Sequence, residues 1–262
     1  MRSRDIRRKY GQNYLTDKSV LFKMADAISP TSSDNFLEIG PGLGALTEQI
    51  NKDDINIIAI DIDSENTEIL KKKFTGPANF QFLTDDILKY KIDNDRQRIV
   101  GNLPYNISTQ ILAKWIKIKE LDKFCKKLVL MFQKEVADRI IAKYNTSAYG
   151  RLTVLANWKL KIVKVCDIKP DSFFPKPKVD SSLLLFTPKN KIFKIKDPKN
   201  LEKVTRVFFS HRRKMLKKPF NQLFNGDQKI LDKLKIDLNL RPQNLDFETY
   251  YKLTSEYEDL RS

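Results

Sequence analysis

Short apolar runs alternate with stretches of helical periodicity along the first two thirds of the chain. The first runs cover residues 36–39, 55–60, 80–83, 99–100 and 128–132. Strands that alternate with helices predict an α/β fold with a parallel, doubly wound sheet. Two later runs, 162–165 and 182–186, predict an antiparallel, hairpin-like pair at the edge of this sheet.

A helical pattern precedes the first of these runs. After Asp17, apolar residues share one helical face, namely Val20, Leu21, Met24, Ala25 and Ile28. An aspartate in front of such a pattern is a typical N-cap, and a proline such as Pro30 cannot continue a helix. The pattern therefore predicts a helix that starts after Asp17 and ends before Pro30.

The last third of the chain becomes strongly basic. Residues 189–218 contain 12 Lys or Arg but only two acidic residues, Asp197 and Glu202. This change in composition predicts one domain over residues 1–188 and a second over residues 189–262.

Helical periodicity dominates the second predicted domain. Three helices are predicted there, over residues 201–216, 228–235 and 247–256. The first of them carries an apolar stripe suited to burial. Its members are Leu201, Val204, Val207, Phe208 and Leu216.

The chain as a whole is basic. It has 262 residues, is 41% hydrophobic and carries a formal net charge of +16. Such a chain can bury a substantial core. Its positive charge points to a polyanionic partner, which is either a nucleic acid or a membrane surface. A run of about 18 apolar residues, as a transmembrane helix requires, is not found in the sequence.

Cysteine and histidine usage narrows the cell compartment and the chemistry. Cys125 and Cys166 have no Cys or His neighbours, so we expect reduced structural thiols in a cytoplasmic protein. Residues 1–15 form a basic N-terminal arm, which is not followed by the apolar segment of a signal peptide. The single histidine, His211, argues against a histidine-ligated metal site, and we expect no metal.

A glycine-rich segment follows the first apolar run. Residues 38–44 read Glu-Ile-Gly-Pro-Gly-Leu-Gly. Glycines let the backbone turn tightly against a ligand at the carboxyl end of a strand, and a purely structural turn is the alternative. The spacing is G-x-G-x-G rather than the G-x-G-x-x-G of dinucleotide-binding folds.

Acidic residues end the next two apolar runs. Asp61 can accept both ribose hydroxyls of an adenosine group, and the alternative is a helix N-cap, a role for which Asp63 competes. The third run ends in residues 84–87 (Thr-Asp-Asp-Ile), where an acid can accept an adenine amino group. Ile62 and Ile87 can sandwich the ring. Together these strand ends favour S-adenosylmethionine over NAD.

The tetrapeptide Asn102-Leu103-Pro104-Tyr105 follows the fourth apolar run. Oδ1 of Asn102 and the carbonyl of Pro104 can each accept one N–H of a planar exocyclic amine, and the Tyr105 ring can stack on the base. The sequence resembles motif IV of the amino-methyltransferases. A simple turn at the end of a strand is the alternative.

Four segments, taken together, resemble the ribosomal RNA adenine dimethyltransferases, and in particular the small-subunit branch of that family. They are residues 10–15 (YGQNYL), 38–44 (EIGPGLG), 102–109 (NLPYNIST) and 173–181 (FFPKPKVDS). The resemblance covers nearly the whole chain. It implies a Rossmann-like class I methyltransferase sheet of seven mostly parallel strands, with a small all-helical C-terminal domain.

The resemblance also implies which residues bind S-adenosylmethionine. They are Gln12, Asn13, Leu15, Glu38, Gly40, Asp61, Ile62, Asp86, Ile87 and Asn102. In this assignment Asp61 holds the ribose hydroxyls and Asp86 the adenine amino group. Asn102 positions both the cofactor and the target amine.

Two aromatic residues are implied to hold the target base. Tyr105 and Phe173 stack on opposite faces of an adenine that has flipped out of its helix. The position of Phe173 is counted back from residues 178–181 (Lys-Val-Asp-Ser), and the neighbouring Phe174 is assigned to the core.

The implied substrate is two adjacent adenosines in a hairpin loop near the 3′ end of small-subunit (16S) rRNA, dimethylated late in subunit assembly. The enzyme is expected to be a monomer. Basic residues of the N-terminal arm and of the second domain are expected to contact RNA phosphates. They are Arg7, Arg8, Lys9, Arg212, Arg213 and Lys214.

Three other functions compete with this one. A large-subunit rRNA methyltransferase of the macrolide-resistance type has the same fold and chemistry, but residues 11–15, 211–214 and 240–242 favour the small-subunit branch. A ribosome-assembly factor without catalysis need not keep an intact Asn-Leu-Pro-Tyr sequence. An NAD-dependent dehydrogenase disagrees with the glycine spacing.

Overall fold

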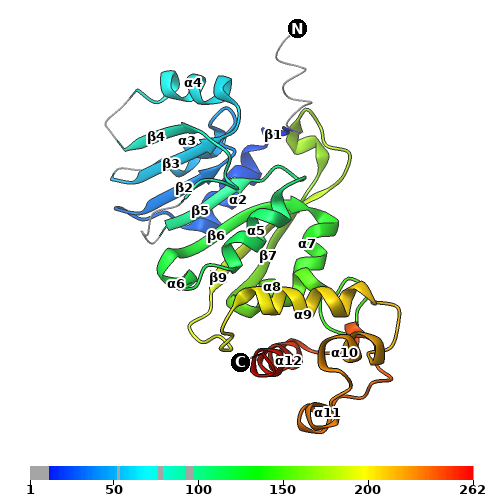
Figure 1. The fold of residues 1–262 in the computed structure, drawn as a ribbon. Coiled ribbons are helices and arrows are strands. Elements are labelled where there is room, and N and C mark those ends of the chain that lie inside the picture. Colours follow the sequence, from blue (N-terminus) through cyan, green and yellow to red (C-terminus); the bar gives the residue numbers. More distant parts are fainter. Residues whose placement is uncertain (1–11, 52–53, 76–78, 92–96, 262) are drawn as a thin grey trace. The chain divides into compact units, whose positions relative to one another are not determined.

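The computed structural model describes residues 12–51, 54–75, 79–91 and 97–261, and the chain divides into two compact units (Figure 1). The first unit is formed within residues 1–137 and 161–188, and the second within residues 138–160 and 189–262. Each unit has its own apolar core. Among the described residues, no helix is both long enough and apolar enough to cross a membrane.

A seven-stranded sheet forms the centre of the first unit in the described part of the chain. Its strands are β2 (Asn35–Ile39), β3 (Asn56–Asp61), β4 (Phe80–Thr84), β5 (Gln97–Asn102), β6 (Cys125–Gln133), β7 (Leu160–Ile168) and β9 (Ser181–Pro188). They lie in the order β4-β3-β2-β5-β6-β9-β7. The pairs from β4 through β6 are parallel, whereas β9 runs antiparallel to β6. The predicted α/β class and sheet are confirmed.

The two strands predicted to pair at the edge are neighbours and are the last two strands of the sheet. Of the two, β7 is the outermost strand, because β9 also pairs with β6. The side chains of Leu183, Leu184 and Phe186 on β9 are all fully buried. A strand that is apolar on both faces is stabilised between two neighbours, not at an edge.

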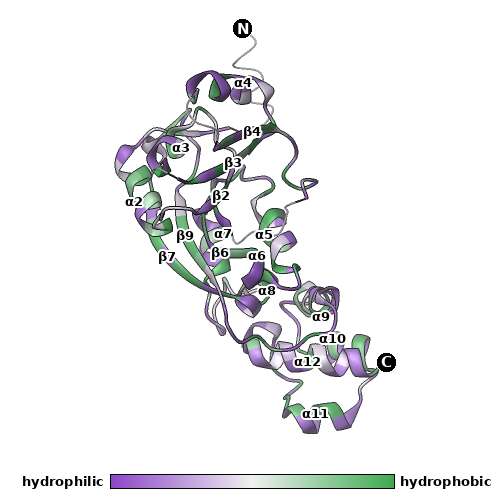
Figure 2. Ribbon diagram, turned by 90° about the vertical axis from the view of Figure 1, so that its left-hand side faces the viewer, coloured by the Kyte–Doolittle hydropathy of each residue, from purple (hydrophilic) through white to green (hydrophobic). Residues whose placement is uncertain are grey.

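Helices cover both faces of the sheet. The helices of the first unit are α2 (Lys18–Ile28), α3 (Ala45–Ile50), α4 (Ser64–Lys73), α5 (Ser108–Ile116) and α6 (Leu121–Phe124). The residues of α7 (Lys134–Ile140) are divided between the two units. Helices α2 and α3 lie on one face and α5 on the other (Figure 2). The prediction for α2 is confirmed: Asp17 accepts a hydrogen bond from the Ser19 N–H at 2.9 Å, and all five predicted apolar residues are buried.

A small second sheet brings the start of the described chain against the first unit. Strand β1 (Tyr14–Leu15) pairs antiparallel with β8 (Phe173–Phe174), which follows a short 3-10 turn, η1 (Pro170–Ser172). The side chains of Leu15 and Phe173 both enter the apolar core. This pairing fixes the residues just before Leu15 beside the main sheet.

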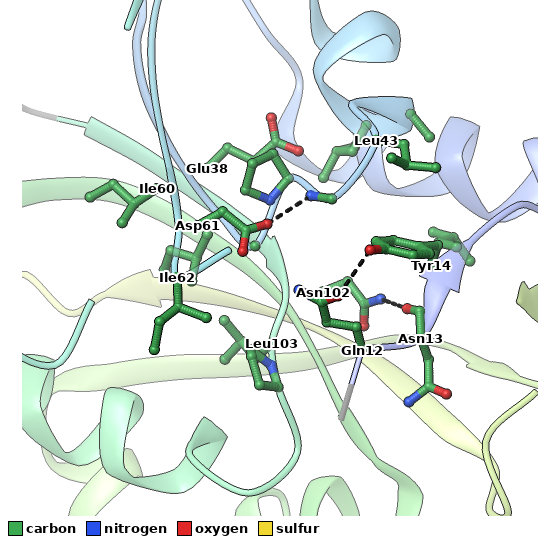
Figure 3. A pocket seen from close by; sticks show the side chains of 18 of the residues that line it. Gln12, Asn13, Tyr14, Glu38, Leu43, Ile60, Asp61, Ile62, Asn102 and Leu103 are labelled. Atoms are coloured by element: carbon green, nitrogen blue, oxygen red, sulfur yellow. Dashed lines mark hydrogen bonds between the residues drawn. The ribbon is translucent and has the colours of Figure 1, made fainter. Parts of the chain in front are cut away.

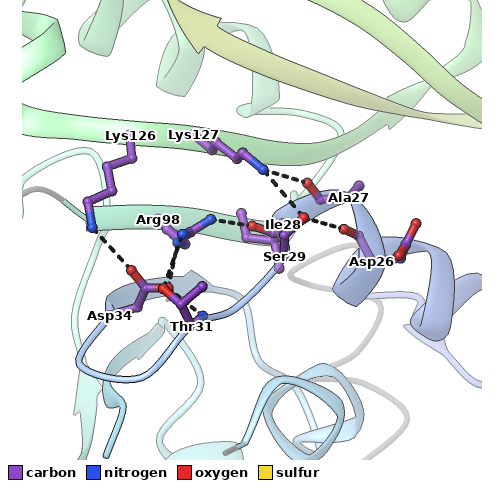
Figure 4. A network of polar contacts seen from close by, with 9 residues as sticks. All are labelled: Asp26, Ala27, Ile28, Ser29, Thr31, Asp34, Arg98, Lys126 and Lys127. Atoms are coloured by element: carbon purple, nitrogen blue, oxygen red, sulfur yellow. Dashed lines mark hydrogen bonds and ion pairs between the residues drawn. The ribbon is translucent and has the colours of Figure 1, made fainter.

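A buried polar network joins α2 to the amino-terminal ends of β2 and β5 (Figure 4). The Asp34 carboxylate accepts hydrogen bonds from the N–H and hydroxyl of Thr31, both at 2.7 Å. It also pairs with Arg98 at 2.7 Å and with Lys126 at 3.2 Å. Arg98 in turn donates to the Ile28 carbonyl at the end of α2. The network therefore fixes the loop between α2 and β2 to two neighbouring strands.

The second unit consists of helices. They are α8 (Arg151–Lys159), α9 (Pro198–Ser210), α10 (Lys217–Phe224), α11 (Gln228–Leu234) and α12 (Phe247–Asp259), with a 3-10 turn η2 (Pro242–Asn244). The prediction that residues 1–188 form one domain is corrected here, because residues 138–160 belong to this unit. Helix α8 contacts α9 and α12, and the Tyr251 hydroxyl donates to the Val154 carbonyl.

The first predicted helix of this unit is too long. Helix α9 ends at Ser210, and a separate helix, α10, starts at Lys217. The Ser210 hydroxyl donates back to the Val207 carbonyl, and the Leu216 N–H donates to Leu240 rather than to the turn before it. Leu216 is buried as predicted, but it starts α10 instead of extending α9.

Candidate active site

A cavity of about 370 Å³ opens at the carboxyl ends of the parallel strands. Its walls come from the first unit, within residues 12–16, 38–48, 60–62, 85–87 and 102–107, together with Leu21, Met24 and Lys73. Figure 3 shows side chains from several of these segments facing the same space. The carboxyl edge of a doubly wound sheet is where ligands bind in this class of fold. All ten residues predicted to bind a cofactor line this cavity.

The glycine-rich turn forms one wall of the cavity beneath the Tyr14 ring. Gly42 has φ +56°, and a Cβ atom there would lie 2.6 Å from Cδ1 of Tyr14. Only glycine fits this left-handed position without displacing the ring. The Tyr14 hydroxyl lies 2.9 Å from Gln12 Oε1 and 3.2 Å from Asn66 Oδ1. Tyr14 therefore links the segment before β1 to the turn and to α4.

Asp61 ends β3 with its carboxylate at the cavity wall. It accepts hydrogen bonds from Gly42 N at 3.3 Å, Asp63 N at 2.9 Å and Asn66 Nδ2 at 3.0 Å. Burial raises the pKa of this carboxyl group. Asp63, and not Asp61, caps α4 by accepting from the Glu65 N–H. The helix-cap alternative is therefore excluded for Asp61, whose side chain lies at the cavity wall.

Glu38 lies below the glycine-rich turn and is only 1% exposed. Its Oε2 accepts a hydrogen bond from the Thr47 hydroxyl at 2.7 Å. Burial, opposed by the Thr47 hydrogen bond and assisted by the nearby Asp61 carboxylate, raises the pKa of Glu38 to about 7. Near neutral pH this side chain therefore exchanges between its protonated and ionised forms.

An apolar slot with acidic residues beside it lies at the ends of β3 and β4. Ile62 is 47% exposed and lines the cavity, and the buried Ile87 lines it as well. Asp85 and Asp86 line the same region, and Asp86 Oδ1 accepts a hydrogen bond from the Leu88 N–H. An exposed isoleucine inside a cavity supplies an apolar face for a flat ring.

Asn102, the last residue of β5, lines the cavity. Asn102 Nδ2 donates a hydrogen bond to the Asn13 carbonyl at 2.7 Å (Figure 3). This bond assigns the two ends of the amide, so that Oδ1 is the end left to accept a hydrogen bond from a ligand. Tyr105 also lines the cavity, and burial raises the pKa of its hydroxyl.

The predicted role of the Pro104 carbonyl is wrong. That oxygen accepts hydrogen bonds from Ile107 N at 3.1 Å and Ser108 N at 3.0 Å. Both of its lone pairs are therefore used at the start of α5. The ring of Pro104 still lines the cavity, as does the preceding residue, Leu103.

The predicted stacking role of Phe173 is also corrected. Its side chain is 2% exposed and lies in the apolar core with Leu15, so it does not line the cavity. Phe174, which the sequence assigned to the core, is 62% exposed. Alternate side chains of a strand point to opposite faces, and the pairing of β1 with β8 turns Phe173 inward.

The residues predicted to bind RNA fall into two groups. Arg7, Arg8 and Lys9 lie outside the described residues. In the second unit, Arg213 and Lys214 are exposed between α9 and α10. Arg212 is half-buried, and its guanidinium group donates to the Ser147 carbonyl, so it holds a neighbouring loop in place.

Several side chains that hold the site residues in place escaped prediction. Thr47 holds Glu38, Asn66 holds Asp61, and Ser181 contacts the Tyr105 hydroxyl. The residue types carry no signal by themselves. Asn66, five residues after Asp61 and within the first turn of α4, is the one that a local pattern comes nearest to predicting.

Comparisons with known proteins agree with this geometry. The model of the ribosomal RNA adenine dimethylase family matches residues 3–259. "Ribosomal RNA small subunit methyltransferase A" of Pelagibacter ubique (strain HTCC1062) is 52% identical over 97% of this chain and 98% of its own length. The protein of the same name from Borreliella burgdorferi (strain ZS7) is 37% identical over 95% of this chain and 88% of its own length.

Two solved structures have a fold similar to that of this chain. A dimethyladenosine transferase from Plasmodium falciparum has a TM-score of 0.82 and 30% identity, and the match covers 94% of this chain and 97% of that one. The 23S rRNA methyltransferase ErmE has a TM-score of 0.72 at 20% identity, covering 94% and 100%, which indicates a common fold. By sequence over nearly its whole length, this chain belongs to the ribosomal RNA adenine dimethylase family.

Proposed function

We propose that this chain transfers methyl groups from S-adenosylmethionine to the exocyclic amines of two adjacent adenosines near the 3′ end of small-subunit (16S) rRNA. The observation that carries this proposal is the hydrogen bond from Asn102 Nδ2 to the Asn13 carbonyl. Because Nδ2 makes this bond, Oδ1 of Asn102 is the amide atom left to accept a hydrogen bond from a ligand. Asn102 and Asp61 line the same cavity. Family membership and the small-subunit relatives support the choice of substrate.

The cavity fits S-adenosylmethionine. The Asp61 carboxylate, held by three donors, would accept the ribose hydroxyls, and Ile62 and Ile87 would cover the adenine ring. Asp86 would accept from the adenine amino group. A volume of about 370 Å³ lies within the range of small-molecule sites. When bound, this cofactor supplies an electrophilic methyl group on a positively charged sulfur.

The target amine needs two acceptors for its two N–H bonds. Oδ1 of Asn102 supplies one of them. The Leu103 carbonyl is the better candidate for the second, because Leu103 lines the cavity and its carbonyl accepts no hydrogen bond from the described residues. These acceptors draw the nitrogen lone pair out of conjugation with the ring. Placing such dipoles in advance contributes on the order of several kcal/mol to methyl transfer.

Tyr105 would hold the base. A base that undergoes chemistry must leave its stack and enter a pocket. Stacking on one aromatic ring contributes about 1–3 kcal/mol. Phe174, which is exposed and lies opposite Tyr14 across the β1–β8 pair, replaces Phe173 as the candidate for a second aromatic contact.

The partner that best matches the basic surface is RNA. The net charge of +16 favours a polyanion, and the exposed Arg213 and Lys214 are available for phosphate contacts. We expect Arg7, Arg8 and Lys9 to act in the same way. We also expect a monomer that works in the cytoplasm, where bacterial small subunits are assembled.

The test is methyl transfer from labelled S-adenosylmethionine to small ribosomal subunits that lack the modification, with large-subunit RNA in parallel. Dimethyladenosine in 16S rRNA alone is the expected result. Label in large-subunit RNA alone would assign the chain to the macrolide-resistance type. Tight binding to small subunits with no label on either RNA would favour a non-catalytic assembly factor.

A further inference from the structure

The Tyr105 hydroxyl has one specific partner outside its own loop. Its oxygen lies 2.6 Å from the Ser181 hydroxyl, 76 residues further along the chain, and either group can donate. Tyr105 is half-buried at the cavity wall, whereas Ser181 is 0% exposed. A buried hydroxyl must be hydrogen-bonded, so this contact cannot be replaced by water without cost.

Ser181 stands on rigid backbone. It is the first residue of β9, and its Cα pairs with Gln133 of β6. The carbonyl of the preceding Asp180 accepts from the Lys134 N–H at 2.9 Å, and the Asp180 carboxylate pairs with Lys169 at 2.7 Å. The Ser181 hydroxyl is therefore a fixed point, while the Tyr105 ring projects from a loop.

We propose that Ser181 is a positioning residue for methyl transfer, whose hydroxyl fixes the Tyr105 ring at the angle required to stack on the target adenine. The inference rests on the proposed function of this site. A tyrosine side chain has two rotatable bonds, and anchoring its hydroxyl removes most of that freedom before the base arrives. A group that is already in place need not lose this entropy on binding.

The contact persists across the working pH range. Burial raises the pKa of the Tyr105 hydroxyl, so both partners stay neutral near neutral pH. A serine hydroxyl does not titrate there. The contribution of Ser181 to the rate is therefore expected to be independent of pH between about 6 and 9.

The neighbouring Ser182 provides a matched control. It lies on the same strand, is also 0% exposed, and its hydroxyl donates to Asp167 Oδ1 at 2.6 Å. Neither Ser182 nor Asp167 lines the cavity. Replacing Ser182 by alanine removes an equally buried hydroxyl without touching Tyr105.

The test compares Ser181→Ala, Tyr105→Phe, the double variant and Ser182→Ala in single-turnover methylation of small subunits. We expect Ser181→Ala to lower the rate by about tenfold, with the Kd for S-adenosylmethionine changed by less than about twofold. Tyr105→Phe should cause a similar loss, and the double variant should be no slower than either single one. Ser182→Ala should stay within about twofold of the wild type.

Two results would overturn the proposal. One is a wild-type rate for Ser181→Ala. The other is a double variant in which the two losses multiply, since Ser181 would then act independently of Tyr105.

A second measurement does not depend on catalysis. The protein is labelled with 3-fluorotyrosine and studied by fluorine NMR. The resonance of Tyr105 is assigned by its absence from the spectrum of Tyr105→Phe. Ser181→Ala should shift and narrow it toward that of a freely rotating ring, and Ser182→Ala should not. An unchanged signal in Ser181→Ala would contradict the proposal. A wild-type protein that methylates neither RNA would instead contradict the proposed function, while this signal still tests the ring anchor.

Discussion

The side-chain amide of Asn102 donates to the backbone carbonyl of Asn13 at 2.7 Å, across 89 residues of sequence. The bond joins the end of β5 to the segment just before β1. It thus connects the residue that would bind the target amine to the segment that would contact the methionine end of the cofactor. The two halves of the proposed site depend on each other through this contact.

Asn102→Asp should loosen that connection. A carboxylate keeps an acceptor oxygen but cannot donate to the Asn13 carbonyl, and it repels that oxygen instead. We expect amide hydrogen exchange in residues 13–16 to become at least about fivefold faster, because a hydrogen bond there contributes about 1 kcal/mol or more. Asn106→Asp, at an exposed position in the loop that follows β5, is the control. Equal exchange in both variants would show that the bond does not hold this segment.

Asp61→Ala should weaken binding of S-adenosylmethionine. The carboxylate is positioned by three donors and would accept two ribose hydroxyls, and hydrogen bonds to a charged group contribute about 1.5–3 kcal/mol. The Kd from calorimetry should rise by at least about tenfold. Asp63→Ala removes a helix cap instead, so its main effect should be about 1 kcal/mol of stability. If Asp63→Ala weakened binding more than Asp61→Ala, the two roles would have to be exchanged.

Glu38 should make the protein less stable as the pH rises. Its pKa is raised from 4.5 to about 7 in the folded chain, so the folded state holds this proton where the unfolded state has lost it. The stabilisation is complete below about pH 4.5 and is lost as the pH rises through 7. Glu38→Gln should remove the dependence, a difference of about 3 kcal/mol between pH 5 and 8.

Urea unfolding between about pH 5 and 8 measures how the free energy of unfolding depends on Glu38. Glu68→Gln, on the exposed face of α4, is the control. Asp61, whose pKa burial also raises, is present in both proteins, so the difference measures Glu38 together with its interaction with Asp61. Parallel stability curves for Glu38→Gln and the wild type would contradict a protonated Glu38.

Asp34 should have the opposite dependence on pH. Burial alone would raise its pKa, but hydrogen bonds from Thr31, Arg98 and Lys126 hold it at about 2. Its contribution is therefore complete above about pH 3.8 and is lost as the pH falls toward 2. Asp34→Asn should lower the free energy of unfolding at pH 7 by about 3–5 kcal/mol, because Arg98 would stay buried without a counter-ion.

The matched variant replaces both members of the Asp34–Arg98 ion pair instead of removing only one of them. Asp34→Leu combined with Arg98→Met leaves no unpaired buried charge, so it should be closer to the wild type in stability than Asp34→Asn. A double variant that is less stable than Asp34→Asn would mean that the network in Figure 4 stabilises the fold by more than charge compensation.

Local patterns predicted those features that depend on local contacts. Helix α2 begins after Asp17 and buries the predicted face, since a cap and a helical repeat are both encoded within a few residues. The strands of the main sheet were predicted because each is a short apolar run between polar segments. The residues around the cavity could also be identified, because in a parallel sheet the strand ends meet at one edge.

The errors arise where tertiary contacts decide the outcome. Phe173 and Phe174 are equivalent in sequence, and only the pairing of β8 with β1 determines which of them is buried. The Pro104 carbonyl was available in the sequence but is used by the first turn of α5. Helix α9 ends early because Leu216 is held by Leu240, which lies far along the chain.

The central claim is that Asn102 presents an acceptor to the target amine, and single-turnover methylation with Asn102→Ala tests it most directly. Small subunits are incubated with the wild type, Asn102→Ala or Asn106→Ala, and the 3′ fragment of 16S rRNA is analysed by mass spectrometry. We expect dimethylation of both adjacent adenosines by the wild type and by Asn106→Ala, and a rate lower by at least about 100-fold with Asn102→Ala. Asn102→Ala that binds S-adenosylmethionine and methylates both adenosines at the wild-type rate would contradict the claim.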